Sequence, residues 1–276
     1  MTFLEIIYLL NVGLATYNVR QHVPSNIPTH NQIIVAENLK SQQHLNVINE
    51  WTKKKKMKLN EKKTKSMIFN FTKKFQFTTQ LAVNDQPIEI VKETKLLGTF
   101  LTDDLKWDKN TSEIVKSAWQ RMQLLYKSAS FTSNRMDLKN IYLTFVRSVL
   151  EKSAVVWHSS LTKNNITALE RVQKAAVRVI LGNSFINYQE GLKTLNLDKL
   201  DARREKLCLK FAKKCLNNEK VKHMFPKKIN KHLMKKRNIK KYKVNFARTK
   251  RYKKSAIPFM AELLNKEDQE KKLMMI

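Results

Sequence analysis

The chain has 276 residues, with 54 lysines and arginines against 23 aspartates and glutamates, which gives a net charge of +31. A field of this sign attracts polyanions, and nucleic acid is the commonest such partner. Lysine far outnumbers arginine, so a general lysine bias of the proteome accounts for a share of this charge. A hydrophobic content of 42% is sufficient for a buried core and excludes a chain that is disordered throughout.

The first part of the chain combines helical segments with short strands. An apolar helix is predicted over residues 3–15, a loop over 16–31 and a second helix over 38–56. From residue 57 onward, short apolar stretches alternate with turns, one of them at Asn84-Asp85. Strands are predicted at 57–59, 66–69, 75–77, 81–83, 88–91 and 96–101. Together they predict a small antiparallel sheet built from hairpins.

The remainder of the chain has helical periodicity. From Asp108, apolar residues recur at three- and four-residue spacing, with breaks near 132–134, 161–165 and 182, and a later helix is predicted over 198–216. Residues 218–255 are strongly basic and are predicted to pack poorly, before a short helix near 256–266. A run of strands followed by a run of helices indicates the α+β class.

The cysteines and the apolar N-terminal run bear on the compartment. Cys208 and Cys215 argue against a disulfide framework, and their seven-residue spacing predicts buried thiols on one helix face. A zinc site would need more ligands than these two and His223. The run over 3–15 is shorter than the roughly 20 residues that cross a bilayer, and no basic segment precedes it. We expect an intracellular protein, nuclear or cytoplasmic, without a membrane partner.

Three sequence blocks occur in a characteristic order. The first is Leu-Asn-Glu-Lys-Lys-Thr-Lys-Ser-Met-Ile-Phe at 59–69, and the second is Leu-Leu-Gly-Thr-Phe-Leu-Thr-Asp-Asp-Leu-Lys-Trp at 96–107. The third is Leu-Glu-Arg-Val-Gln-Lys-Ala-Ala-Val-Arg-Val-Ile-Leu-Gly at 169–182. In this order and spacing they resemble the region downstream of the catalytic aspartates in reverse transcriptases of non-LTR (LINE-type, jockey-like) retrotransposons. The resemblance extends over most of the chain.

The resemblance implies a domain organisation and a set of partners. Residues 1–107 would be the C-terminal part of a polymerase palm with primer-grip strands, 108–217 a helical thumb, and 218–276 a basic C-terminal extension. Leu97-Gly98 resembles the primer grip, whose backbone holds the primer end. The thumb of the family cradles the minor groove of the template–primer through shape and phosphate contacts. The implied partners are RNA, DNA or their hybrid.

The family's chemistry depends on carboxylates that the resemblance places outside this chain. Aspartates hold two Mg²⁺ ions, of which one activates the primer 3′-hydroxyl and the other stabilises the pyrophosphate. The adjacent pair would lie immediately before Met1, in a missing N-terminal half, so no metal ligand or cofactor is expected in this chain. Lys63, within an Asn-x-x-Lys-Thr pattern, matches a lysine that protonates pyrophosphate in related polymerases. A solvated turn is the equal alternative for Lys63.

Other chemistry-bearing residues have structural interpretations. Asp103-Asp104 follows a predicted strand, but it lies inside the second block, and no earlier strand offers a matching third carboxylate. A turn or a helix N-cap is therefore preferred for this pair. His158 is predicted to pack or cap rather than to catalyse. The four tryptophans are predicted to lie mostly in the core by their spacing.

Two groups of basic residues are the candidate nucleic-acid contacts. Arg171, Lys174 and Arg178 recur at helical spacing and therefore share one helix face. This face would contact phosphates beside a template–primer groove or would be a solvated exterior, and the sequence leaves both open. The basic C-terminal segment with its interleaved aromatic residues suits binding by charge and stacking. A disordered solubilising tail is the alternative.

Two functional hypotheses follow. The first is a palm and thumb fragment of a retrotransposon RNA-directed DNA polymerase that binds template–primer nucleic acid and is inactive alone. Such a fragment would be a truncated remnant or part of a polymerase whose gene model lost an upstream exon. The second is a self-standing, non-enzymatic nucleic-acid-binding protein derived from the element, which a transcript starting at Met1 would favour. Both predict sequence-independent binding that weakens with salt.

Overall fold

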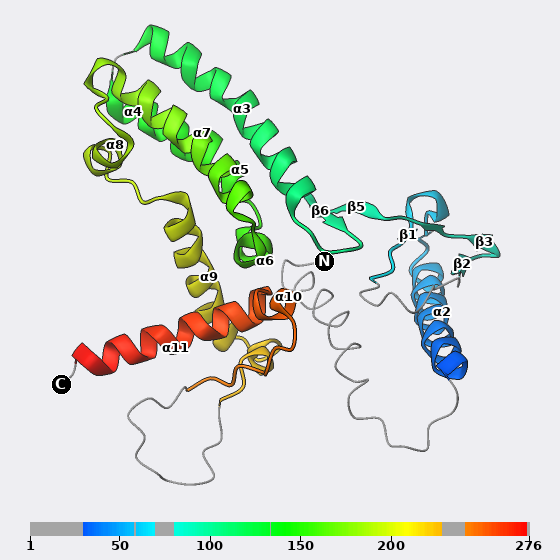
Figure 1. Cartoon of the computed structure of the whole chain (residues 1–276). Coiled ribbons are helices and arrows are strands. Elements are labelled where there is room, and N and C mark those ends of the chain that lie inside the picture. The colour runs from blue at the N-terminus through cyan, green and yellow to red at the C-terminus, as the bar shows by residue number, and fades with distance from the viewer. Residues whose placement is uncertain (1–29, 58, 70–79, 133, 228–240, 275–276) are drawn as a thin grey trace. The chain divides into compact units, whose positions relative to one another are not determined.

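The computed structural model describes residues 30–57, 59–69, 80–132, 134–227 and 241–274 (Figure 1). The chain divides into two compact units, with a boundary between Lys106 and Trp107. We call the described residues before this boundary the N-terminal unit and those after it the helical unit. The helix predicted over 3–15 and the strand predicted at 75–77 lie outside the described residues.

The N-terminal unit begins with the long helix α2 (His30–Lys54), which confirms the helix predicted over 38–56 and extends it toward the N-terminus. The side-chain amide of Gln42 binds the main chain of Ala82 twice. Its Nε2 donates to the carbonyl oxygen of Ala82 at 2.8 Å, and its Oε1 accepts from the amide nitrogen of Ala82 at 3.0 Å. These two bonds attach α2 to the strand segment that follows.

The strands of this unit form three two-stranded ladders among the described residues. Two are antiparallel hairpins: β2 (Ala82–Val83) with β3 (Gln86–Pro87), and β5 (Glu93–Leu96) with β6 (Thr99–Thr102). The third pairs β1 (Lys65–Ser66) in parallel with β4 (Glu89–Ile90). The α+β class is confirmed, but the single antiparallel sheet is wrong, because the strands form three separate ladders and one of them is parallel.

Two turns decide this arrangement. The predicted turn at Asn84-Asp85 is confirmed, since both residues have positive φ angles of 48° and 60°, which suit a tight hairpin. The strand predicted over 96–101 is instead a hairpin, because Leu97 and Gly98 also have positive φ angles of 48° and 79°. The apolar pattern of this segment gives no sign of the turn except the glycine.

The helical unit contains two long helices, α3 (Asp108–Phe131) and α7 (Lys163–Leu181), which lie side by side in Figure 1. Shorter helices connect and cover them: α4 (Arg135–Ile141), the π-helix η2 (Tyr142–Arg147), α5 (Ser148–Leu150), α6 (Ala154–Trp157) and α8 (Tyr188–Thr194). The predicted breaks near 132–134, 161–165 and 182 are confirmed. The core between α3 and α7 includes Ala118, Met122, Leu125, Leu169, Val172 and Ala176, all fully buried.

Side chains fix the starts of these helices. Asn134, Thr162 and Asn187 each accept a hydrogen bond from a main-chain amide in the first turn of α4, α7 and α8. Such caps satisfy amide groups that the helix itself leaves without partners. Gly191 in α8 permits a close approach to α7, because a Cβ atom there would lie 2.5 Å from Cγ1 of Val177.

A second core joins α9 (Leu200–Leu216) to α11 (Ala256–Met274). Cys208 and Cys215 are buried free thiols in it, as predicted. Val221, Phe225 and Tyr242 are also buried there, so the prediction of poor packing over 218–255 is wrong for the described part of that segment. These three apolar side chains are scattered among cations and follow no period, which is why the pattern did not reveal them. The predicted short helix near 256–266 continues to Met274.

Candidate nucleic-acid interface

One face of α7 presents Arg171, Lys174 and Arg178 to solvent, which confirms that they share a face. The opposite face is buried through Val172, Ala176 and Ile180. The guanidinium of Arg178 also lies over the ring of Phe185, at 5.0 Å from its centre. The amphipathic pattern of α7 therefore positions three cations in a row on the outside of the helical unit.

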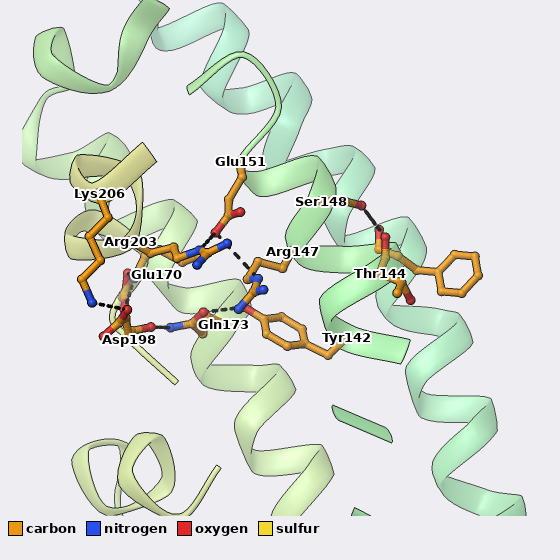
Figure 2. A network of polar contacts seen from close by, with 12 residues as sticks. Tyr142, Thr144, Arg147, Ser148, Glu151, Glu170, Gln173, Asp198, Arg203 and Lys206 are labelled. Carbon is orange, nitrogen blue, oxygen red and sulfur yellow. Dashed lines mark hydrogen bonds and ion pairs between the residues drawn. The ribbon is translucent and has the colours of Figure 1, made fainter. Parts of the chain in front are cut away.

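A buried polar network holds the inner side of α7 (Figure 2). The hydroxyl of Tyr142 donates to Oε1 of Gln173 at 2.5 Å. Nε2 of Gln173 donates to the hydroxyl of Tyr188 and to the carbonyl oxygen of Asp198, both at 2.9 Å. The hydroxyl of Tyr188 donates in turn to Glu170. Because the network joins the π-helix, α7 and α8, it fixes the rotation of α7 and hence the direction of its cations.

The protonation of this network follows from its burial. Burial raises the pKa of the Glu170 carboxyl, while hydrogen bonds from Tyr188 and from the main-chain amide of Leu200 act in the opposite direction. Burial also raises the pKa of Tyr142 well above its ordinary value, so this hydroxyl remains a donor over the range in which proteins fold. The network therefore orients α7, and it holds a carboxyl group whose pKa is raised by burial.

Carboxylates already neutralise other cations of the helical unit. Glu151 accepts from Arg203 at 3.0 Å and lies 3.7 Å from Arg147, and Asp198 pairs with Lys206 at 2.7 Å (Figure 2). By contrast, no ion pair involves Arg171, Lys174 or Arg178 in the part of the chain that the structure describes. These three cations therefore form a row on α7 that an external phosphate could approach, and Lys163 is a further exposed cation at the start of the helix.

Arg204 in α9 is a buried cation that the sequence did not single out. It is 0% exposed, its Nε lies 3.4 Å from Nδ1 of His158, and its guanidinium lies 5.8 Å from the ring centre of Trp157. Burial lowers the pKa of Arg204, opposed by the carboxylates of Glu170 and Asp201. Helical spacing marks this arginine, because it lies four residues after Leu200 and four before Cys208, both of them buried.

His158 packs against this arginine, which confirms the predicted packing role. Its ring meets that of Phe259 edge to face, with centres 5.7 Å apart. Burial, and next the nearby charge of Arg204, lower the pKa of His158 to about 4. A neutral imidazole that accepts from Arg204 is consistent with a structural residue.

The Asn-x-x-Lys-Thr pattern forms a local turn that includes η1 (Glu61–Lys63). Oδ1 of Asn60 accepts from the main-chain amide of Lys63 at 3.0 Å, and the Thr64 hydroxyl donates to the carbonyl oxygen of Asn60 at 2.8 Å. The side chain of Lys63 is exposed. Asparagine and threonine thus have a conformational role at this spacing, and Lys63 is presented to solvent at the turn.

Leu97 and Gly98 form the tip of the β5–β6 hairpin. Leu97 is 49% exposed and has a left-handed backbone conformation that a leucine adopts at a cost of about 1–2 kcal/mol. Beside the turn, the ammonium of Lys95 lies 5.1 Å from the ring centre of Phe100. The hairpin therefore presents an apolar side chain and two adjacent main-chain units at a strained tip.

The Asp103-Asp104 pair lies in a turn, as predicted. Asp104 accepts from the Thr102 hydroxyl at 2.8 Å and from the main-chain amide of Lys106 at 3.0 Å, and it pairs with the Lys106 ammonium at 2.8 Å. Burial raises the pKa of Asp104, but the hydrogen bonds from Lys106 and Thr102 outweigh it and lower the pKa to about 2. Among the described residues, no three histidine, cysteine or acidic side chains are grouped so that they could hold a metal ion.

The tryptophans divide between the core and the surface. Trp107 and Trp157 are buried as predicted, whereas Trp51 is 53% and Trp119 is 38% exposed, so the prediction is wrong for those two. Spacing alone did not separate Trp119 from the core, because Trp119 directly follows the buried Ala118 in the periodic segment of α3.

No helix of the described residues is both long and apolar enough to cross a membrane. Comparisons of the chain with protein-family models, with curated proteins and with solved structures find no match. A functional assignment therefore rests on the residues of this chain and on their arrangement.

Proposed function

We propose that the chain is a palm and thumb fragment of a non-LTR retrotransposon reverse transcriptase that binds template–primer nucleic acid and lacks the catalytic aspartates. The order of the three sequence blocks and the net charge of +31 support this assignment. The observation that carries the binding function is the row of exposed cations Arg171, Lys174 and Arg178, which no carboxylate of the described residues neutralises.

The spacing of this row suits a phosphate backbone. Seven residues of α-helix separate Arg171 from Arg178, which corresponds to about 10 Å along the helix axis. Phosphates of one strand advance about 3.4 Å per nucleotide along a duplex, so the row covers about three of them. Contacts of this kind depend on charge and shape, and they would bind RNA, DNA or a hybrid without reading sequence.

The N-terminal unit would contribute the primer grip in this proposal. Leu97-Gly98 presents main-chain groups at a hairpin tip, which is the kind of contact the resemblance implies. Lys63 would meet pyrophosphate only beside the carboxylates and Mg²⁺ ions of a complete polymerase. The function proposed for this chain is therefore binding.

The experiment compares two variants with equal loss of charge. Replacing Arg171, Lys174 and Arg178 by glutamine should weaken binding to an RNA–DNA hybrid duplex severalfold. Replacing Lys152, Lys193 and Lys210 by glutamine should weaken binding to the hybrid duplex much less. These three lysines are exposed elsewhere on the helical unit. Equal losses would show that only net charge matters and would remove the α7 face from the proposal.

The self-standing binding protein remains a second candidate. The observation in its favour is that the helical unit has buried cores of its own. The in-frame transcript upstream of Met1 distinguishes the two: an aspartate pair directly before Met1 supports the polymerase fragment, and a stop codon supports the self-standing protein.

A further inference from the structure

Residues 241–254, Lys-Tyr-Lys-Val-Asn-Phe-Ala-Arg-Thr-Lys-Arg-Tyr-Lys-Lys, form a segment that we name the basic strap. It contains seven lysines and arginines and no acidic residue. All seven cations are exposed, and the strap has no helix until α10 (Lys250–Lys253). In Figure 1 the strap is the orange segment that leads into α10 and α11. Its basic composition is typical of a flexible tail, but hydrogen bonds hold both of its ends.

One end of the strap is fixed by a buried amide. The main-chain amide of Tyr242 donates to Oδ1 of Asn265 at 2.8 Å, and Nδ2 of Asn265 donates back to the carbonyl oxygen of Tyr242 at 3.0 Å. Asn265 is 3% exposed and the Tyr242 side chain belongs to the second core. The next amide, of Lys243, donates to the carbonyl oxygen of Pro226 at 2.9 Å.

At the other end one hydroxyl caps α10 within the strap, and a second attaches the strap to the rest of the helical unit. The Thr249 hydroxyl accepts from the main-chain amide of Tyr252 at 3.2 Å and so caps α10. The Ser160 hydroxyl donates to the carbonyl oxygen of Lys254 at 2.8 Å. Because both ends are attached, little conformational entropy remains to be lost when the strap binds a partner.

Between these attachments the strap exposes an aromatic ring. Phe246 is 88% exposed, although a phenylalanine side chain stabilises a fold only when it is buried. Lys243, Arg248 and Lys250 lie within four residues of it and are exposed, and no carboxylate among the described residues pairs with them. An exposed ring among unneutralised cations combines the two elements that bind unpaired nucleic acid: a stacking surface and charges for the phosphates.

We infer that the basic strap binds a single-stranded segment of nucleic acid, with one base stacked on Phe246. This inference rests on the proposed function and deepens it, because it assigns duplex phosphates to the α7 face and an unpaired strand to the strap. A base within a duplex has both faces covered by its neighbours, so Phe246 would act only on unpaired bases. The substrate class of the strap is therefore a single strand of DNA or RNA, such as an overhang beside the duplex.

The test measures the affinity of the full chain for oligothymidylate, which has no secondary structure, and for a blunt hybrid duplex. Phe246→Ala should weaken oligothymidylate binding by about tenfold, the expected loss of one base–aromatic stack, and change duplex binding by less than about twofold. Phe246→Trp should retain the affinity for oligothymidylate. Phe131→Ala is the matched control, because Phe131 is 89% exposed but lies at the end of α3, away from the strap sequence.

Each outcome decides the inference. The single-strand assignment would be overturned if Phe246→Ala bound oligothymidylate as tightly as the wild type does. It would also be overturned if the variant lost equal affinity for oligothymidylate and for the hybrid duplex. Loss of binding to phosphatidylserine vesicles with no loss on oligothymidylate would assign the strap to a lipid surface instead. If the wild-type chain bound neither nucleic acid, the proposed function itself would fail. Since Phe246 is almost fully exposed, its variants should fold normally, which circular dichroism would verify.

Discussion

The partial burial of His158, beside the charge of Arg204, makes the stability of the helical unit depend on pH in a defined window. Burial and the charge of Arg204 lower the pKa of His158 from 6.5 to about 4. The folded state therefore keeps the imidazole neutral, while the unfolded chain takes up a proton below its ordinary pKa. The part of the free energy of unfolding that depends on His158 therefore keeps its full value above pH 6.5 and decreases as the pH falls from 6.5 toward 4.

The size of the effect follows from the difference in pKa. The pKa of His158 falls from 6.5 to about 4, and a change of one in pKa corresponds to about 1.4 kcal/mol, so the full effect is about 3.5 kcal/mol. The half-buried position of His158 makes this an upper bound. His158→Gln removes the titrating group while keeping a side-chain oxygen that can accept from Arg204.

The assay is urea denaturation of the wild type and of His158→Gln across this pH range. As the pH decreases, the free energy of unfolding of the wild type should decrease more steeply than that of the variant. Glu170, whose pKa is raised, contributes with the opposite sign in acid, because its folded form takes up a proton first. Its contribution is common to both proteins and cancels in their difference. His223→Gln, at an exposed site, is the control. Parallel profiles of wild type and His158→Gln would refute the lowered pKa of His158 and the burial that causes it.

Further substitutions test the packing and the turns, each by thermal or urea denaturation. Gly191→Ala should destabilise the protein by about 1–3 kcal/mol, because its Cβ would lie 2.5 Å from Val177; unchanged stability would disprove the close approach. Gly182→Ala should also cost about 1–3 kcal/mol although no atom lies within 4 Å, because φ is 50° and ψ is −126° there, a conformation that residues with a side chain rarely adopt. Leu97→Asn should stabilise the hairpin by about 1 kcal/mol, since asparagine tolerates its backbone, and a loss would contradict the turn. Asn265→Ala should cost about 1–3 kcal/mol, because both main-chain groups of Tyr242 lose a partner, and a neutral effect would mean that the strap is not fixed there.

The sequence predicted what depends on local periodicity. Helical spacing located α3, α7 and α9, and the same periodicity placed Arg171, Lys174 and Arg178 on one exposed face. The turn at Asn84-Asp85 was also predictable, because both residue types tolerate positive φ angles.

What depends on distant contacts was not predictable. The strand pairing follows from which short segments meet in space, and the turn at Leu97 contradicts the preference of leucine. The strap is ordered because Asn265, more than twenty residues after Tyr242, supplies its hydrogen bonds. Arg204 is a different case, because its four-residue spacing from Leu200 and Cys208 places it on the buried face of α9 and could have located it.

The measurement that tests the central claim most directly is the salt dependence of binding to an RNA–DNA hybrid duplex. The logarithm of the binding constant of the wild-type chain should fall linearly with the logarithm of salt concentration. If the α7 row alone neutralises three phosphates, the slope of this plot should be about −2.7 or steeper. The variant with Arg171, Lys174 and Arg178 replaced should lose most of the part of the slope that the row contributes. An affinity that barely changes between low and high salt, or a variant with the wild-type slope, would contradict the account.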